Sequence, residues 1–87
     1  MHFLYILRCA DESLYIGETD DIEHRVARHH EGRACAFTAS RRPVELVYVE
    51  ELANHLEARR REHQLKRWTR RKKEALVAGD LDLLKRL

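Results

Sequence analysis

Two matching apolar runs near the start of the chain constrain its fold more than any other feature. The run HFLYILR begins at His2, the polar segment CADES follows from Cys9, and the run SLYIGE ends at Glu18. Both runs have the length of a strand, so residues 2–18 are expected to form an antiparallel hairpin. The first run is apolar on both faces, which predicts a strand covered by helices on each side.

A helix is expected directly after the hairpin. Asp20 and Glu23 have the spacing of a capping box, which opens a helix whose Ile22 and Val26 point inward. Gly32 is well suited to the left-handed conformation that often ends a helix. The first helix is therefore expected to end near Gly32.

A loop and a third strand are expected next. Residues 33–42 show no sustained period and lead into Pro43, which disfavours helix before it. The segment VELVYVEE alternates as a strand does, and Val47 and Val49 fall on one of its faces. The opposite face is expected to hold Val44 and Leu46, and Tyr48 as well if the alternation continues.

Three helical segments are expected in the last third of the chain. Asn54 and Glu57 form a second capping box, which starts a helix running to about Trp68. Thr69 can cap a shorter helix that ends at Gly79. Asp80 can cap a last turn that buries Leu81, Leu84 and Leu87.

The resulting expectation is a single small domain over residues 1–87. Its class is α/β of the α+β type, with a three-stranded antiparallel sheet flanked by helices in the order β-β-α-β-α-α. With 87 residues and no long apolar run, the chain is expected to be a cytoplasmic protein without a membrane partner. Cys9 and Cys35 do not have a CxxC spacing and are interpreted as reduced, structural residues.

Positive charge is concentrated in one block of the chain. Residues 59–73 hold nine lysines and arginines and one acid, whereas residues 1–58 hold six basic and eleven acidic residues. This density is typical of a surface that binds a phosphate backbone or another polyanion. A solvated helix face is the simpler alternative, but such faces usually mix both signs.

The single acid of the basic block occupies an unusual position. Ala58 and Leu65 define the buried stripe of the predicted helix, and Glu62 lies between them on the same stripe. A carboxylate on a packing face costs stability unless it is paired or binds a metal. An ion pair with Arg59 or Lys66 would explain Glu62 structurally, and a metal would explain it functionally.

Other metal and nucleophile motifs are weak in this sequence. The six histidines are scattered, and the pairs His24/His29 and His55/His63 lack the spacing of helical metal ligands, which weighs against a transition-metal site. No Walker loop or Ser/His/Asp order is present.

The strongest pattern spans five positions from the hairpin to the basic block. Tyr5 in LYI, Tyr15 in YIG, Arg25 and His29 on the next helix, and Glu62 in EARRREHQLK together resemble the GIY-YIG nuclease domain. The resemblance covers the chain from Phe3 to about Lys73 and is greatest to the small stand-alone bacterial GIY-YIG proteins. The first motif reads LYI here in place of GIY.

This resemblance implies a one-metal mechanism of phosphodiester hydrolysis. Glu62 would hold one divalent cation, Mg²⁺ or Mn²⁺, and Tyr15 would activate the attacking water. Tyr5 would orient the water and the phosphate, while Arg25 would neutralise charge on the phosphoryl oxygens. His29 would contact the same phosphate or share in proton transfer, for which an unperturbed histidine has a suitable pKa.

The resemblance also implies a nucleic-acid substrate, DNA rather than RNA, including branched or damaged DNA. Because 87 residues leave no room for a targeting domain, low sequence specificity is expected, with a protein partner or dimerisation as a further route to target choice. Phosphate contacts are expected from Arg59, Arg60, Lys66, Arg67, Arg70, Arg71, Lys72 and Lys73.

Two other functions are weighed beside a DNA endonuclease. Some family members carry a lysine three residues after the second tyrosine, where this chain has Glu18, and His29 is then the expected substitute base. This difference favours the alternative of a nucleic-acid-binding module with little turnover. A purely structural or protein-docking role is the third alternative. Glu62 discriminates among them, because a lone acid weakens phosphate binding but is required for metal catalysis.

Overall fold

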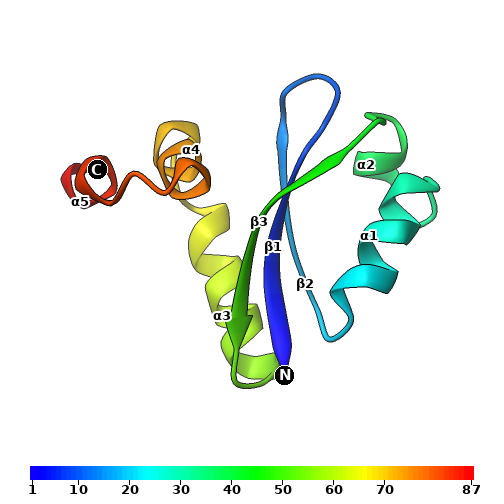
Figure 1. The fold of residues 1–87 in the computed structure, drawn as a ribbon, viewed down its shortest axis with the longest axis horizontal. Helices are drawn as coiled ribbons and strands as arrows, with labels where there is room; N and C mark the ends of the chain where they lie inside the picture. The colour runs from blue at the N-terminus through cyan, green and yellow to red at the C-terminus, as the bar shows by residue number, and fades with distance from the viewer.

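The computed structural model describes residues 1–87 and shows a three-stranded antiparallel sheet between two groups of helices (Figure 1). The strands β1 (His2–Arg8), β2 (Leu14–Thr19) and β3 (Glu45–Leu52) lie in the order β2-β1-β3. The helices are α1 (Ile22–His30), α2 (Ala36–Ala39), α3 (His55–Lys66), α4 (Arg70–Ala78) and α5 (Leu81–Arg86). The α+β class is confirmed, and the expected element order is found with two short helices, α2 and α5, added to it.

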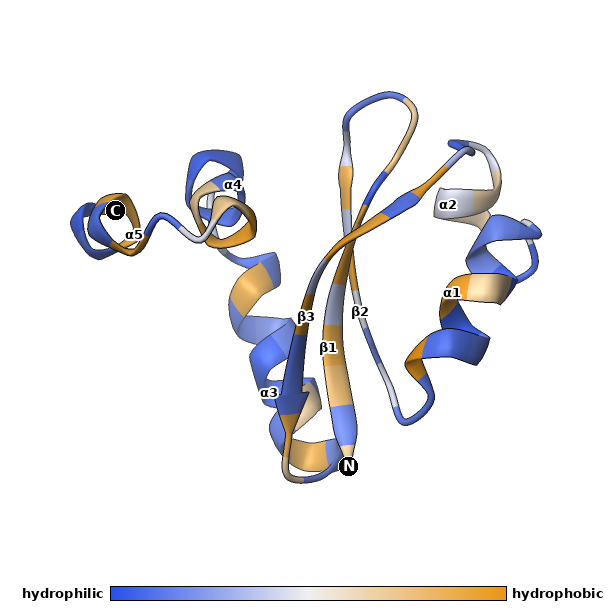
Figure 2. Ribbon diagram, in the orientation of Figure 1, coloured by the Kyte–Doolittle hydropathy of each residue, from blue (hydrophilic) through white to orange (hydrophobic).

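The face of the sheet toward α3 and α4 buries an aliphatic cluster. Leu4 and Ile6 of β1 pack with Ile16 of β2, Leu65 of α3 and Leu76 of α4. Four of the five side chains are at most 3% exposed. Much of the central strand β1 is orange in Figure 2, while much of α3 is blue, as expected for a helix with one buried stripe.

The opposite face of the sheet packs against α1. Tyr5 and Leu7 of β1 form a second buried cluster with Cys9 and Val44, and partly buried side chains of α1 cover it. Helices therefore cover both faces of β1, as its two apolar faces predict (Figure 1).

Side-chain caps begin most of the helices. Asn54, Thr69 and Asp80 each accept a hydrogen bond from the backbone amide three residues later, as expected. The first helix differs, because Asp21 rather than Asp20 is its cap and accepts the corresponding hydrogen bond. Two adjacent aspartates offer the same chemistry, and Asp21 is the one with the extended backbone of an N-cap.

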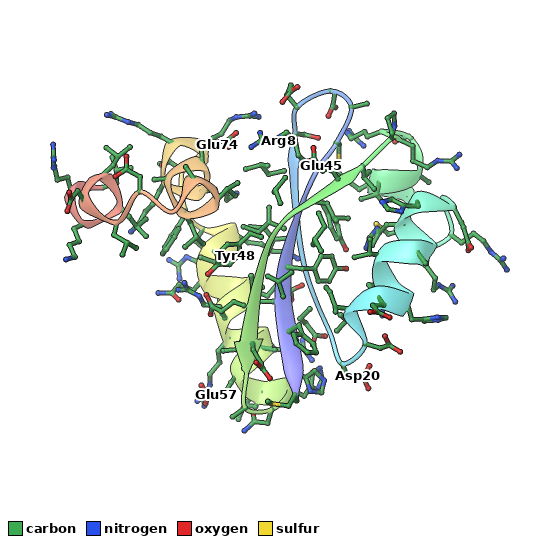
Figure 3. All side chains as sticks on the ribbon, in the orientation of Figure 1. Arg8, Asp20, Glu45, Tyr48, Glu57 and Glu74 are labelled. Carbon is green, nitrogen blue, oxygen red and sulfur yellow. The ribbon has the colours of Figure 1, made fainter.

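A β-bulge changes which face of β3 Tyr48 occupies. Ile6 pairs with Tyr48 and Leu7 pairs with Leu46, so Val47 is an extra residue between the two pairs. Tyr48 consequently faces α3, where Figure 3 labels it, and not the side of Val44 and Leu46. The predicted continuation of the alternation to Tyr48 is therefore wrong.

Two further expectations are corrected. Residues 33–42 are not all loop, because they contain α2, whose four residues are too few to show a helical period. Helix α5 does not bury the three expected leucines: Leu81 is 64% exposed and Leu87 is 38% exposed, while Leu84 packs partly on the aliphatic cluster.

No helix of the chain has both the length and the apolar character that crossing a membrane requires.

Candidate active site

The two repeated tyrosines lie on the face of the sheet that α1 covers. Tyr5 is opposite Gly17 in the register of β1 and β2, and Tyr15 is opposite Leu7. Residues directly opposite in antiparallel strands share a face, so the two phenol rings are neighbours, with centroids 6.3 Å apart. The two strands thus bring both phenols to one place.

Gly17 makes this arrangement possible. A Cβ atom at this position would lie 2.5 Å from the Tyr5 hydroxyl oxygen and 2.6 Å from the Tyr5 Cζ atom. Any side chain at Gly17 would therefore displace the Tyr5 ring or the strand. The glycine that follows Tyr-Ile in β2 is explained by this close approach.

A buried chain of hydrogen bonds continues from Tyr5. The Tyr5 hydroxyl and His29 Nε2 are 2.8 Å apart, and His29 Nδ1 and Thr38 Oγ1 are also 2.8 Å apart. Thr38 Oγ1 lies 3.4 Å from Cys35 Sγ. Tyr5, His29 and Thr38 are each at most 1% exposed, so these polar groups are satisfied by one another.

His29 is a neutral base in this environment. Burial, the nearby positive charge of Arg25 and the neighbouring His30 together lower the pKa of His29 to about 4. The near-neutral pKa expected from the sequence is therefore wrong. We assign the tautomer in which Nδ1 donates to Thr38 and Nε2 accepts from the Tyr5 hydroxyl.

Both phenols stay protonated at neutral pH. Burial is the largest cause that raises the pKa of Tyr5, and burial together with a hydrogen bond to Cys35 raises the pKa of Tyr15 to about 12. The negative charge of Glu62 further raises both pKa values, whereas the positive charge of Arg25 lowers them. The charges of Arg25 and Glu62 thus act on the same two hydroxyls.

Tyr5, Tyr15 and His29 therefore lie together, and the charges of Arg25 and Glu62 act on both phenols. The Tyr15 ring also lies 5.1 Å, between centroids, from the His29 ring, which α1 supplies. Arg25 comes from the same helix one turn earlier, and Glu62 comes from α3 on the other side of the sheet.

Glu62 has the surroundings of an available ligand. Its helix neighbours Ala58 and Leu65 are fully buried, while the Glu62 side chain is 23% exposed. Its only polar contact is an ion pair with Lys66, in which Nζ lies 3.5 Å from Oε2. The Lys66 side chain is 54% exposed, and an ion pair of this kind is weak. The ion pair with Lys66 that would explain Glu62 structurally is thus present, and it leaves the carboxylate accessible to a ligand.

The predicted phosphate-binding residues differ in how free their charges are. Arg60 pairs with Glu57, and Lys72 lies over the Trp68 ring with Nζ 4.3 Å from its centroid. Side chains without an ion pair or hydrogen bond to the protein belong to Arg59, Arg67, Arg71 and Lys73.

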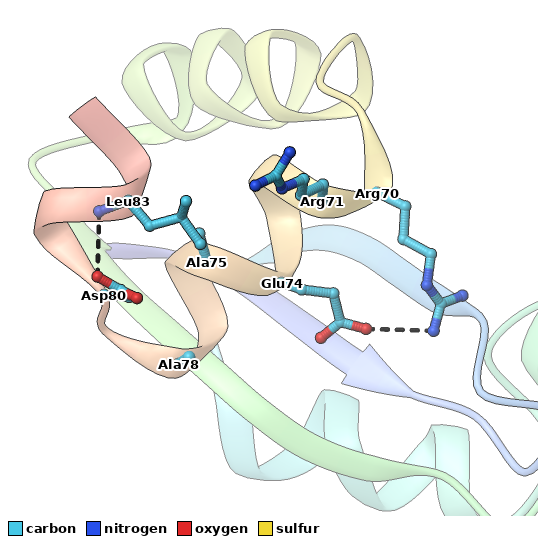
Figure 4. Close-up of a pocket in the computed structure, with 7 residues that line it drawn as sticks. All are labelled: Arg70, Arg71, Glu74, Ala75, Ala78, Asp80 and Leu83. Carbon is cyan, nitrogen blue, oxygen red and sulfur yellow. Dashed lines mark hydrogen bonds and ion pairs between the residues drawn. The ribbon is translucent and has the colours of Figure 1, made fainter. Parts of the chain in front are cut away.

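Arg70 is engaged within the fold. Its guanidinium donates to the Glu12 carbonyl oxygen at 2.6 Å and to the Glu74 carboxylate at 3.1 Å (Figure 4). Glu74 also accepts two hydrogen bonds from Arg8, at 2.7 and 2.8 Å, and Figure 3 shows these two residues side by side. Arg70 therefore fastens α4 to the hairpin, which the count of basic residues alone did not reveal.

Three residues of the site were not singled out for it by the sequence. Gly17 carries a signal, because it follows the second Leu-Tyr-Ile, but its reason lies in the Tyr5 ring opposite. Thr38 and Cys35 belong to α2 and its cap, where no periodicity marked a helix. Burial raises the pKa of the Cys35 thiol, but hydrogen bonds from Thr38 and Tyr15 outweigh burial and leave that pKa lowered.

Comparisons with known proteins agree with this arrangement. The family model described as the GIY-YIG catalytic domain matches residues 1–75. A UPF0213 protein of Natronomonas pharaonis is 47% identical over 79 residues, which are 91% of this chain and 93% of the relative. A UPF0213 protein of Bacillus pumilus is 45% identical over 76 residues, which are 87% of this chain and 78% of the relative. The solution NMR structure of a UPF0213 protein from Bacillus halodurans has 40% identity and a TM-score of 0.58, covering 88% of this chain and 82% of that one.

Proposed function

Because this chain belongs to the GIY-YIG catalytic domain family, which implies nuclease-type activity in general, we propose that it is a metal-dependent endonuclease that hydrolyses phosphodiester bonds of DNA. The observation that carries the proposal is Glu62. It is the single acid of an otherwise basic block, and its charge acts on both phenols of the site.

Glu62 fits a hard divalent cation, Mg²⁺ or Mn²⁺. Its carboxylate accepts no hydrogen bond within the protein, and its one ion pair, to Lys66, is exposed. One carboxylate with bound waters suits Mg²⁺, which keeps much of its hydration. When bound, the cation supplies charge neutralisation at the scissile phosphate and at the departing 3′ oxygen.

The remaining charges of the site position and stabilise the phosphate. Arg25 lies on the side of α1 that faces the phenols, and its guanidinium neutralises charge on the phosphoryl oxygens. Tyr15 is partly exposed, and its hydroxyl donates a hydrogen bond to the same oxygens. The raised pKa of Tyr15 suits a donor better than a base.

The proton of the attacking water goes to His29 through Tyr5. The Tyr5 hydroxyl takes a proton from the water as it passes its own proton to His29 Nε2, 2.8 Å away. Neutral His29 has the free electron pair that this transfer needs, and Thr38 holds the ring in the required tautomer. Because its pKa of about 4 makes His29 a weak proton acceptor, the transfer is favoured only as negative charge develops on the phosphate. His29 thus acts as the base in place of the lysine that some family members carry where this chain has Glu18.

Phosphates on either side of the cut contact the free cations of α3 and α4. Arg59, Arg67, Arg71 and Lys73 carry charges that no acid of the protein neutralises. Such contacts do not read bases, so weak sequence preference and strong salt dependence are expected.

A nucleic-acid-binding module with little turnover is the alternative. The raised pKa values of both phenols favour it, because neither tyrosine provides a phenolate base at neutral pH. Binding and cleavage must therefore be measured separately.

The test uses the purified chain with end-labelled single-stranded, duplex and branched DNA, in Mg²⁺ or in EDTA. We expect cleavage by the wild type in Mg²⁺ only, and none by Glu62→Ala, whose DNA affinity is retained or increased. Glu57→Ala, an exposed acid on the same helix, is the matched control and should cleave normally. Binding without cleavage by the wild type would favour the alternative, and Mg²⁺-dependent cleavage by Glu62→Ala would remove Glu62 from the mechanism.

A further inference from the structure

We propose that His2, Glu18 and His55 form a binding site for a divalent transition-metal cation of the Zn²⁺ class. His2 begins β1, Glu18 lies near the end of β2, and His55 is the first residue of α3. The three residues come from three elements that meet at one corner of the sheet. The site is separate from the cation proposed at Glu62 and does not rest on the proposed nuclease activity.

The potential ligand atoms are already close together. One nitrogen of each histidine and one carboxylate oxygen of Glu18 all lie within 4.8 Å of one another. His55 Nε2 is 3.3 Å from Glu18 Oε1, and the imidazole centroids of His2 and His55 are 5.0 Å apart. Tetrahedral zinc with ordinary bond lengths separates its ligand atoms by about 3.3 Å, so small side-chain rotations complete the site.

One carboxylate oxygen of Glu18 lacks a hydrogen-bond partner. Its side chain is 21% exposed, but its Oε2 atom is buried and has no hydrogen-bond partner. No other buried side-chain oxygen or nitrogen in the protein lacks one. A buried carboxylate oxygen without a partner is costly, and a cation bound through Oε2, or through both carboxylate oxygens, would remove that cost.

The ligand chemistry selects the kind of metal. Two imidazole nitrogens and one carboxylate oxygen suit Zn²⁺ and similar cations, whereas Mg²⁺ prefers an all-oxygen shell. Three protein ligands leave a fourth position for water, and the exposed His55 gives a path for entry. His55 and Glu62 are seven residues apart on α3, which corresponds to about 10 Å of helix rise. Glu62 is not among the residues whose ligand atoms lie together here, so the two proposed cation positions are separate.

A cation at this site would join the start of β1, the end of β2 and the first turn of α3. Because it binds the folded chain, it should raise the unfolding temperature. This site was hard to predict from the sequence, because His2 and His55 are 53 positions apart and only the fold brings their rings together.

The test is a Zn²⁺ titration of the untagged, metal-free chain in competition with a chromophoric zinc chelator. We expect one equivalent to bind and to raise the unfolding temperature, with no comparable effect of Mg²⁺. His55→Ala and Glu18→Gln should each weaken Zn²⁺ binding by at least about tenfold. His63→Ala, which removes another exposed histidine of α3, is the matched control and should leave binding unchanged.

A second measurement keeps the result independent of folding defects in the variants. In the wild-type chain, Zn²⁺ should shift the imidazole NMR signals of His2 and His55 and leave those of His24 in place. Absence of stoichiometric binding to the wild type would overturn the proposal. Binding that survives His55→Ala but is lost in His63→Ala would do the same.

Discussion

The two faces of β1 bury different kinds of side chain. Toward α3, Leu4 and Ile6 belong to a cluster whose buried members are all aliphatic, with Tyr48 and Trp68 packed against it. Toward α1, Tyr5 is equally buried, but its hydroxyl is hydrogen-bonded to His29, which in turn is hydrogen-bonded to Thr38. One strand thus carries an apolar core on one face and a chain of polar groups on the other.

This difference separates stability from chemistry. Aliphatic burial stabilises the fold in rough proportion to the area removed from water and requires little directional geometry. Buried polar groups give little net stability and become costly when one partner is lost. A chain of them beside an arginine and a carboxylate is therefore better explained by the proposed reaction than by packing.

The largest effect on stability is expected on the aliphatic face. Ile6→Ala should lower the free energy of unfolding by about 4 kcal/mol, because it removes a fully buried side chain and leaves a cavity. Urea denaturation measures this change. Leu56→Ala, at a residue 58% exposed, is the control and should cost less than about 1 kcal/mol. Equal losses for both variants would remove the distinction between core and surface.

The next effect concerns pH and belongs to the polar face. The folded pKa of His29, about 4, lies below its unfolded value, so the unfolded chain binds the proton first as pH falls. This stability is complete above about pH 6.5 and is lost between about pH 6.5 and 4, by about 3 kcal/mol. Unfolding measured at several pH values should show this slope in the wild type and in His30→Gln, but not in His29→Gln. A slope that persists in His29→Gln would place its origin elsewhere.

A smaller effect is expected at the contact between the two hairpin strands. Gly17→Ala should destabilise the fold by about 1 to 2 kcal/mol, because the new methyl group meets the Tyr5 ring. In a Tyr5→Leu background the same change should cost less, since the ring atoms that it meets are gone. A double-mutant cycle measures this coupling. Additive losses would mean that Gly17 does not exist to accommodate Tyr5.

Much of the fold could be predicted because its signals are local. The hairpin, the third strand and the caps at Asn54, Thr69 and Asp80 each depend on a few neighbouring residues. The choice of Asp21 over Asp20 and the bulge at Val47 could not be predicted, because each depends on the conformation or pairing of the backbone.

The candidate site was predictable in its residues but not in its electrostatics. The spacing of the residues and the family resemblance were enough to select Tyr5, Arg25 and Glu62 before any distance between their atoms was known. The low pKa of His29 depends on its burial and on Arg25, and its partner Thr38 lies on a helix too short to have a period. Such properties arise only when the elements pack.

The most direct test of the polar face is the single-turnover rate of DNA cleavage in Mg²⁺ by Tyr5→Phe, measured beside its unfolding free energy. Removing this hydroxyl should lower the stability by about 1 to 3 kcal/mol, because it leaves the buried His29 Nε2 without a hydrogen-bond partner. The cleavage rate should fall by about a hundredfold or more, since the proposed path of the proton from the water to His29 is removed. Cleavage by Tyr5→Phe at the wild-type rate would contradict the role given to this face of β1.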